Sequence, residues 1–242
     1  HSDNISSYWT TSANCMLCIV PLLLLIPNVC LNVTELHYTG LERAINLLLP
    51  LGVYLLVCSF IRRIGIATLC LLPIMILCAF QIVLLFLYGE SIIAIDMFLN
   101  VATTNVHEAS ELLSNLSVAI VVVCLVYLPQ IIIAIILIIN KVDTTERPRR
   151  MARLYGTALI VAGAACWLCT DDYNASRRLF PVNVISNMVD AFKRTEMSDS
   201  YFKTSDSFRF HSVRCDNDTA GIYVMIIGET SRADNWQLGG YK

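Results

Sequence analysis

Residues 116–140 read LSVAIVVVCLVYLPQIIIAIILIIN, an unbroken apolar stretch rich in β-branched side chains. A buried strand of a soluble protein covers only about 4–8 residues, whereas a helix that crosses a membrane needs about 20 apolar residues. The length of the stretch therefore decides between a strand and a helix. It predicts a membrane-spanning helix over 116–139.

Four further stretches have the length and composition of membrane spans: 14–33, 44–61, 64–87 and 152–170. The chain is 56% hydrophobic and 15% charged, whereas roughly 45–50% apolar residues are usual in soluble domains. The apolar excess ends near residue 170, and the remainder has the composition of soluble protein. We therefore predict an α-helical integral membrane domain with five transmembrane helices at 14–170, after an N-terminal segment 1–13 that has no role in the fold.

Basic residues are distributed unevenly between the loops that connect these spans. Seven lie between spans two and three or between spans four and five: Arg62, Arg63, Lys141, Arg147, Arg149, Arg150 and Arg153. Only Arg43 lies in the opposite loops. Because cytoplasmic loops carry the excess of Lys and Arg, we predict a multi-pass protein with a cytoplasmic N-terminus. The loop 88–115 and everything after 170 are then external, and the net charge of −2 gives no reason to expect a nucleic-acid partner.

Nine of the ten cysteines lie inside the apolar stretches, including the pairs Cys15–Cys18 and Cys166–Cys169. A C-x-x-C spacing is also found in metal and redox sites. These pairs have no polar flanking residues, so we interpret them as small hydrophobic side chains of the membrane core.

The loop 88–115 is longer than a connection between two spans needs. Asn100, Thr104 and Glu108 are spaced i, i+4, i+8, so on a helix they share one polar face. Spacing alone favours a solvated face of an interfacial amphipathic helix over a binding site. We interpret His107 and Glu111 as solvated residues.

The segment 171–220 reads as a bridge with helical spacing near 182–193 and little regular structure elsewhere. It leads to 221–242, where the short apolar run 222–227 is typical of a buried strand that begins an α/β domain. Glu229 follows this strand, at the edge where α/β sheets place their ligands, and a carboxylate there can bind Zn²⁺. In the alternative interpretation Glu229 is only exposed, and Ser231 or Asp234 caps a following helix. The residues alone leave both open.

Residues Gly228-Glu229-Thr230-Ser231-Arg232-Ala233, with Gly240-Tyr241 shortly after, resemble the first catalytic motif of the phosphoethanolamine transferases that modify lipid A. This family includes the transferable colistin-resistance enzymes and joins five membrane helices to an alkaline-phosphatase-like domain. Its external loop carries a second pattern, which is matched here in register by Met97, Asn100, Thr104, Glu108 and Ala109. The resemblance extends over essentially the whole chain after residue 13.

The resemblance implies a role for each of these residues. Glu229 corresponds to a zinc ligand. Asn100, Glu108 and, more weakly, Thr104 correspond to the site for the phosphatidylethanolamine donor. In the family the nucleophilic threonine and the remaining zinc ligands belong to later motifs, so Thr230 is interpreted as a residue that supports the backbone. We expect no catalytic residue within residues 1–242, and neither transfer activity nor a tight zinc site in this 242-residue form.

The implied activity is transfer of phosphoethanolamine from phosphatidylethanolamine to lipid A or another lipopolysaccharide or glycan acceptor, in the bacterial inner membrane with the C-terminal part in the periplasm. Such a transfer gives resistance to cationic peptides such as polymyxin. Two other functions stay open. One is a glycerol-phosphate transferase of the lipoteichoic acid synthase type, which has the same architecture, and the other is a non-catalytic membrane binding module.

Overall fold

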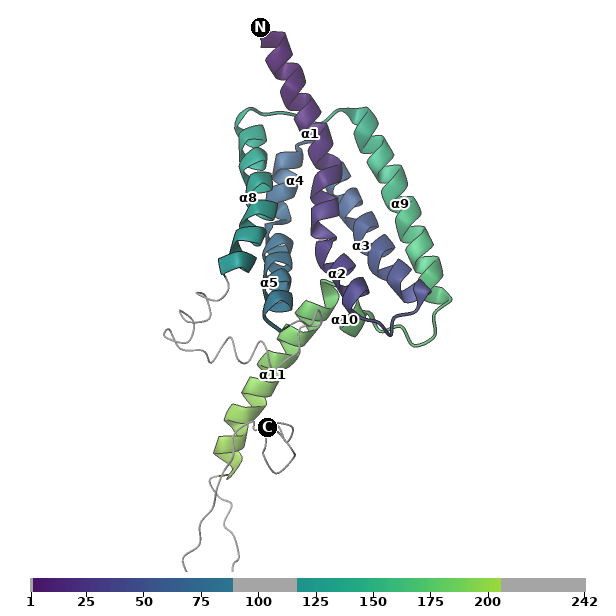
Figure 1. The fold of residues 1–242 in the computed structure, drawn as a ribbon, viewed down its shortest axis with the longest axis vertical. Helices are drawn as coiled ribbons and strands as arrows, with labels where there is room; N and C mark the ends of the chain where they lie inside the picture. The colour runs from purple at the N-terminus through teal and green to yellow at the C-terminus, as the bar shows by residue number, and fades with distance from the viewer. Residues whose placement is uncertain (1, 89–116, 206–242) are drawn as a thin grey trace, which may run out of the picture. The chain divides into compact units, whose positions relative to one another are not determined.

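The computed structural model describes residues 2–88 and 117–205. All regular secondary structure in these residues is helical (Figure 1). The chain divides into two compact units, 1–199 and 200–242, and the first is the bundle described below. The helices in chain order are α1 Ser2–Leu24, α2 Ile26–Thr34, α3 Gly40–Phe60, α4 Ile64–Cys70, α5 Leu72–Tyr88, α8 Ser117–Ile139, α9 Glu146–Leu168, α10 Ala175–Arg178 and α11 Val182–Ser205.

Four segments of the described residues are long and apolar enough to cross a membrane: Ser7–Thr34, Gly40–Phe60, Ser117–Ile139 and Glu146–Leu168. A fifth span results if the bent pair formed by α4 and α5 crosses as one unit. These segments overlap the five predicted from the sequence, although the first begins seven residues earlier than predicted and the last begins six residues earlier. The α-helical membrane domain is thus confirmed at the level of four to five candidate spans.

Proline explains where two of the spans break. The third predicted span, 64–87, is a bent pair in the structure, with an angle of 56° between its halves. The break falls at Leu71, two residues before Pro73, because a proline has no N–H to donate and its ring clashes with the preceding turn. Pro27 follows the break between α1 and α2 in the same way. Pro50 and Pro129, in contrast, lie inside the continuous helices α3 and α8.

Among the described helices, α3 has its most extensive contact with α9, and glycines make the approach possible. A Cβ atom added at Gly52 would lie 2.8 Å from the backbone oxygen of Gly156 and 2.7 Å from the side chain of Ile160. One added at Gly163 would lie 2.8 Å from the side chain of Leu49. Association of helices in lipid depends on van der Waals packing, so small residues that bring two backbones together stabilise the pair.

The core of the bundle joins residues from both halves of the chain. Leu17 and Leu24 of α1, Ile64 of α4 and Leu137 of α8 are almost completely buried in one apolar cluster. Outward-facing side chains of α8 such as Leu125 and Ile132 are exposed instead. A helix that is apolar all round fits a lipid environment, which explains why the sequence of α8 shows no polar face.

The loops that carry most of the basic residues lie at the same end of the bundle and contact each other. Thr144 donates from its backbone N–H and its hydroxyl to the carbonyl of Arg62, at 2.9 and 2.7 Å. Arg63 forms an ion pair with Asp143 at 3.2 Å, and Asn14 of α1 accepts a hydrogen bond from the backbone of Thr145. We call this the arginine end of the bundle.

Arg149 is buried at the arginine end, where it completes the C-terminus of α3. Its guanidinium donates to the carbonyls of Ser59 and Phe60, at 3.0 and 3.3 Å, and to the carboxylate of Glu146 at 3.1 Å. The last carbonyls of a helix have no partner within it, so a buried cation at this position satisfies them and complements the helix dipole.

Two expectations from the sequence were wrong. Residues 1–13 were given no role in the fold, but α1 begins at Ser2, Ala13 is fully buried and Trp9 packs against the core. The segment after 193 was expected to have little regular structure, but α11 continues to Ser205. In both places a polar segment continues the helix of the neighbouring, more apolar segment, and its composition alone did not predict this. The predicted strand 222–227 lies outside the described residues.

The close approach of α3 and α9 gives a stability prediction. Gly52→Ala should destabilise the folded protein by about 1–3 kcal/mol, the usual effect of an extra methyl group in a tightly packed site, because backbone atoms of α9 cannot yield. Thermal unfolding in detergent measures the change. Gly40→Ala is the control, since nothing lies within 4 Å of the added Cβ. Equal melting temperatures for the two variants would contradict the packing.

Candidate functional site

The residues that the sequence assigns to the site lie outside the described part of the chain. Asn100, Thr104 and Glu108 belong to the loop 88–115, and Glu229 lies near the C-terminal end. Their roles in donor and zinc binding stay predictions. The described residues contain a different polar site, at the end of the bundle opposite the arginine end.

The helices α2 and α10 lie at this opposite end (Figure 1). Buried polar side chains connect them to the start of α3. We call these side chains, together with the partly exposed Arg178, the polar cluster. Its members are Asn28, Asn32, Glu42, Asn46, Tyr173 and Arg178. Asn28 and Asn46 are fully buried, and Glu42 is only 5% exposed. Burying polar groups costs free energy unless they are hydrogen-bonded, so such a cluster beside apolar helices indicates a specific structural or functional role.

Glu42 is the centre of the polar cluster. It forms a capping box with Thr39: the Thr39 hydroxyl accepts from the backbone N–H of Glu42 at 3.3 Å, and the Glu42 carboxylate accepts from the backbone N–H of Thr39 at 2.9 Å. The other carboxylate oxygen of Glu42 accepts from the guanidinium of Arg178 in α10. One carboxylate thus begins α3 and holds a segment that lies 136 residues later in the chain.

Asparagine side chains form the other hydrogen bonds of the polar cluster. Asn46 donates to the side-chain oxygen of Asn32 at 3.1 Å and accepts from the hydroxyl of Tyr173. Asn32 donates to the carbonyl of Arg43 at 2.9 Å, and Asn28 donates to the carbonyl of Phe180 at 3.0 Å. These bonds tie α2 and α3 to the segment between α9 and α11.

The same segment is also fixed by apolar contacts. Phe180 is 1% exposed and Val184 is fully buried, and both belong to the main core cluster of the bundle. Trp167 contacts the ring of Tyr173 edge to face, with centroids 5.5 Å apart. The start of α11 is therefore anchored in the membrane domain by polar and apolar contacts together.

This environment raises the pKa of two tyrosines in the connecting segments. Burial raises the pKa of Tyr38 to about 12, and the nearby carboxylate of Glu35 raises it further. The guanidinium of Arg178, whose central carbon lies 5.7 Å from the ring centroid, lowers this pKa. Burial also raises the pKa of Tyr173. Both side chains are neutral at physiological pH, and the hydroxyl of Tyr173 donates a hydrogen bond to the side-chain oxygen of Asn46.

Some polar atoms at this end have no partner within the described residues. They include the side-chain oxygen of Asn28, the hydroxyl of Tyr38 and the side-chain nitrogen of Asn183, all buried. Unsatisfied buried polar atoms are rare in folded proteins. They give this end of the bundle hydrogen-bonding capacity beyond what its own contacts use.

The polar cluster was not predicted from the sequence, although the spacing of its residues indicates it. Asn28 and Asn32 are four residues apart, as are Glu42 and Asn46, and both pairs interrupt otherwise apolar helices. The pattern Thr39-x-x-Glu42 before an apolar run is that of a capping box. The pairing of Glu42 with Arg178 has no signal in a single sequence.

No group of three or more His, Cys, Asp or Glu side chains among the described residues is arranged to hold a metal ion. This holds for the pairs Cys15–Cys18 and Cys166–Cys169. The predicted zinc ligand, Glu229, is not among the residues to which this finding applies.

The apolar spans and the buried polar cluster define the class of protein: a multi-helix membrane protein that holds a polar segment at one end of its bundle. A family model for phosphoethanolamine transferase EptA/EptB matches residues 52–195, which is more than half of the chain, and the chain belongs to this family. The match covers the N-terminal, membrane part of these transferases. No curated protein and no solved structure gave a significant match.

The ion pair between Glu42 and Arg178 gives a second prediction. Arg178→Met leaves a buried carboxylate without its cation and should destabilise the protein by about 1–3 kcal/mol. Adding Glu42→Gln should recover part of this loss, because glutamine can still complete the capping box and carries no charge. Unfolding in detergent gives both values.

Arg177→Met is the matched control, because Arg177 is the exposed neighbour of Arg178 in α10. Limited proteolysis adds a local measurement, since a loosened α10 should be cleaved sooner near Arg177 and Leu179. If Arg178→Met behaves like Arg177→Met in both assays, the ion pair does not hold α10.

Proposed function

We propose that this chain is the membrane part of an enzyme that transfers phosphoethanolamine from phosphatidylethanolamine to lipid A or another lipopolysaccharide acceptor. The observation that carries the proposal is the family match over residues 52–195. In such a transfer the phosphate–oxygen bond to diacylglycerol breaks and a phosphate–oxygen bond to the acceptor forms. The attached ammonium group lowers the negative surface charge that attracts polymyxin and related cationic peptides.

The distribution of charge supports an orientation for this activity. The contacts at the arginine end bring the loops 61–63 and 140–145 together, and the first two turns of α9 add four arginines. By the positive-inside rule this end faces the cytoplasm of a bacterial inner membrane. The polar cluster, the loop 88–115 and the C-terminal part then belong to the periplasmic side, where lipid A precursors are modified.

The donor site is proposed for the loop 88–115. A carboxylate such as Glu108 pairs well with the ammonium of phosphatidylethanolamine, and amide and hydroxyl groups such as those of Asn100 and Thr104 can bind its phosphate. Glu229 is proposed as one ligand of a zinc ion, which when bound supplies Lewis-acid chemistry to phosphoryl transfer. The contacts of the polar cluster support this arrangement indirectly, because they hold the start of α11 at the same end of the bundle.

Two other functions use the same architecture. A transferase of the lipoteichoic acid synthase type would move glycerol phosphate, and the two transferred groups differ in mass. A non-catalytic binding module would leave lipid A unmodified. The family match favours phosphoethanolamine transfer over both.

The donor site gives the third prediction. Asn100→Ala and Glu108→Ala in the full-length protein should each reduce transfer at least tenfold, since loss of a charge-assisted hydrogen bond to the donor costs about 1.5–3 kcal/mol. Mass spectrometry of lipid A from cells that express each variant measures the modified fraction. It also identifies the transferred group.

Glu111→Ala is the matched control, a carboxylate of the same loop that lies outside the family pattern. Membrane fractions should contain all three variants at the wild-type level. Unchanged lipid A modification in Asn100→Ala and Glu108→Ala would contradict the donor site and favour a solvated amphipathic helix in this loop.

The orientation gives the fourth prediction. Reporter fusions at Asp143 and Asp206 should lie on opposite sides of the membrane, with Asp143 in the cytoplasm, because Asp143 pairs with Arg63 at the arginine end. A phosphatase reporter that is active only in the periplasm makes the measurement. Activity from both fusion sites, or from neither, would place residues 143 and 206 on the same side and so contradict an odd number of spans between them.

A further inference from the structure

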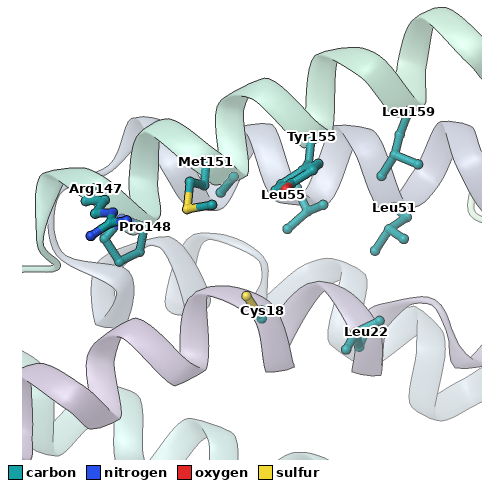
Figure 2. A pocket seen from close by; sticks show the side chains of 10 residues that line it. Cys18, Leu22, Leu51, Leu55, Arg147, Pro148, Met151, Tyr155 and Leu159 are labelled. Carbon is teal, nitrogen blue, oxygen red and sulfur yellow. The ribbon is translucent and has the colours of Figure 1, made fainter.

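An apolar groove runs between α1, α3 and α9 (Figure 2). The residues of α9 that meet Gly52 of α3, Gly156 and Ile160, do not line it. Its cavity volume is about 650 Å³. This lies within the range of roughly 300–1,000 Å³ that is typical of sites for small molecules. The groove is thus large enough to hold a substantial part of a lipid.

The walls of the groove are almost entirely hydrocarbon. Leu22 comes from α1, Leu51 and Leu55 come from α3, and Met151 and Leu159 come from α9 (Figure 2). All three helices belong to candidate membrane spans. A groove with such walls suits an acyl chain, which is the apolar group that surrounds a membrane span.

One cation stands at the mouth of the groove. Arg147, Met151, Tyr155 and Leu159 follow each other at intervals of four along α9, so the guanidinium lies at the end of the row whose deeper members form the apolar wall (Figure 2). Pro148 lies beside Arg147 at the same end. A ligand that follows this row is apolar along its length and meets a positive charge at its end.

The charge of Arg147 is not used by the ion pairs of this region. The carboxylate of Glu146 accepts from Arg149, Arg150 and Arg153, at 3.1, 3.2 and 2.7 Å. No ion pair of Arg147 is present within residues 2–88 and 117–205. The mouth of the groove therefore carries an uncompensated positive charge.

The length of the groove fits one leaflet of a bilayer. Leu159 lies twelve residues after Arg147, which at about 1.5 Å per residue corresponds to about 18 Å along α9. Half of a hydrocarbon core of about 30 Å is about 15 Å. A lipid whose phosphate contacts Arg147 would thus have its acyl chain beside the whole apolar wall.

We propose that this groove is a binding site for an anionic glycerophospholipid of the leaflet at the arginine end, with one acyl chain between α1, α3 and α9 and the phosphate on Arg147. A net negative headgroup complements the unpaired guanidinium, whereas the ammonium of a zwitterionic lipid would be repelled by the arginines around it. The site is separate from the proposed donor site, which belongs to the opposite end of the bundle. It does not depend on the proposed transfer reaction.

The test uses full-length protein reconstituted in nanodiscs of phosphatidylcholine with or without phosphatidylglycerol. Native mass spectrometry after release into detergent should detect one retained phosphatidylglycerol per protein. Arg147→Ala should reduce retention at least tenfold, the effect expected for loss of a charge-assisted contact. Met151→Trp, which fills the groove from an exposed position, should abolish retention while leaving the charge in place.

Matched controls distinguish this site from general attraction of lipid to a basic surface. Arg150→Ala removes an exposed arginine from the same turn, and Leu154→Trp adds the same ring at an exposed position of α9 outside the groove. Both should retain the lipid at the wild-type level, and the elution volume of every variant verifies folding. The proposal is overturned if Arg150→Ala loses as much lipid as Arg147→Ala, if neither groove variant loses lipid, or if phosphatidylethanolamine is retained equally well. Retention of a second protein copy in place of lipid would also overturn it.

Discussion

The structure depends on the close approach of α3 and α9, which only glycine permits. Gly52 and Gly156 allow the two backbones to meet, and Gly163 makes room for Leu49, one turn before Gly52 in α3. In a membrane the apolar side chains gain little from leaving lipid, so the contact surface itself must hold the helices together. Because Gly156 and Gly163 of α9 make this contact, the row formed by Met151, Tyr155 and Leu159 lies on another side of α9. That row forms a wall of the groove beside α1.

Charged side chains complete both ends of α3. At its N-terminus the carboxylate of Glu42 accepts from the backbone of Thr39, and at its C-terminus the guanidinium of Arg149 donates to the carbonyls of Ser59 and Phe60. Each charge has the sign that complements the helix dipole and satisfies groups that a helix leaves unpaired. Each is also shared with a distant segment, since Glu42 binds Arg178 and Arg149 projects from α9. The ends of one helix thus organise the contacts on both sides of the proposed membrane.

The membrane domain could be predicted from the sequence because spans are specified by length and apolarity, which are local properties. Residues 116–139 were assigned almost to the residue, since nothing but a helix satisfies its backbone groups in lipid. The sequence did not predict that the third span breaks at Leu71, because proline is tolerated in some membrane helices, as Pro50 and Pro129 show here. The polar cluster was missed for a different reason. Its central contact joins Glu42 to Arg178, and only the folded chain brings these residues together. The roles of Asn100, Thr104, Glu108 and Glu229 rest on motifs and stay predictions.

The arrangement divides the described part of the chain into two chemically different ends. At the arginine end the cations outnumber the acids that pair with them, and one cation, Arg147, continues directly into an apolar wall. At the other end polar groups are buried against each other and hold the start of α11. If the arginine end faces the cytoplasm, as proposed, turning the bundle over would place the arginines on the opposite side of the bilayer, against the positive-inside rule. A lipid held at the arginine end would strengthen this preference, since its phosphate would anchor α9 at the depth where Arg147 meets the headgroups. The proposed reaction transfers a group from a lipid donor to an acceptor on one face of the membrane. It therefore requires a bundle that keeps one orientation and one depth.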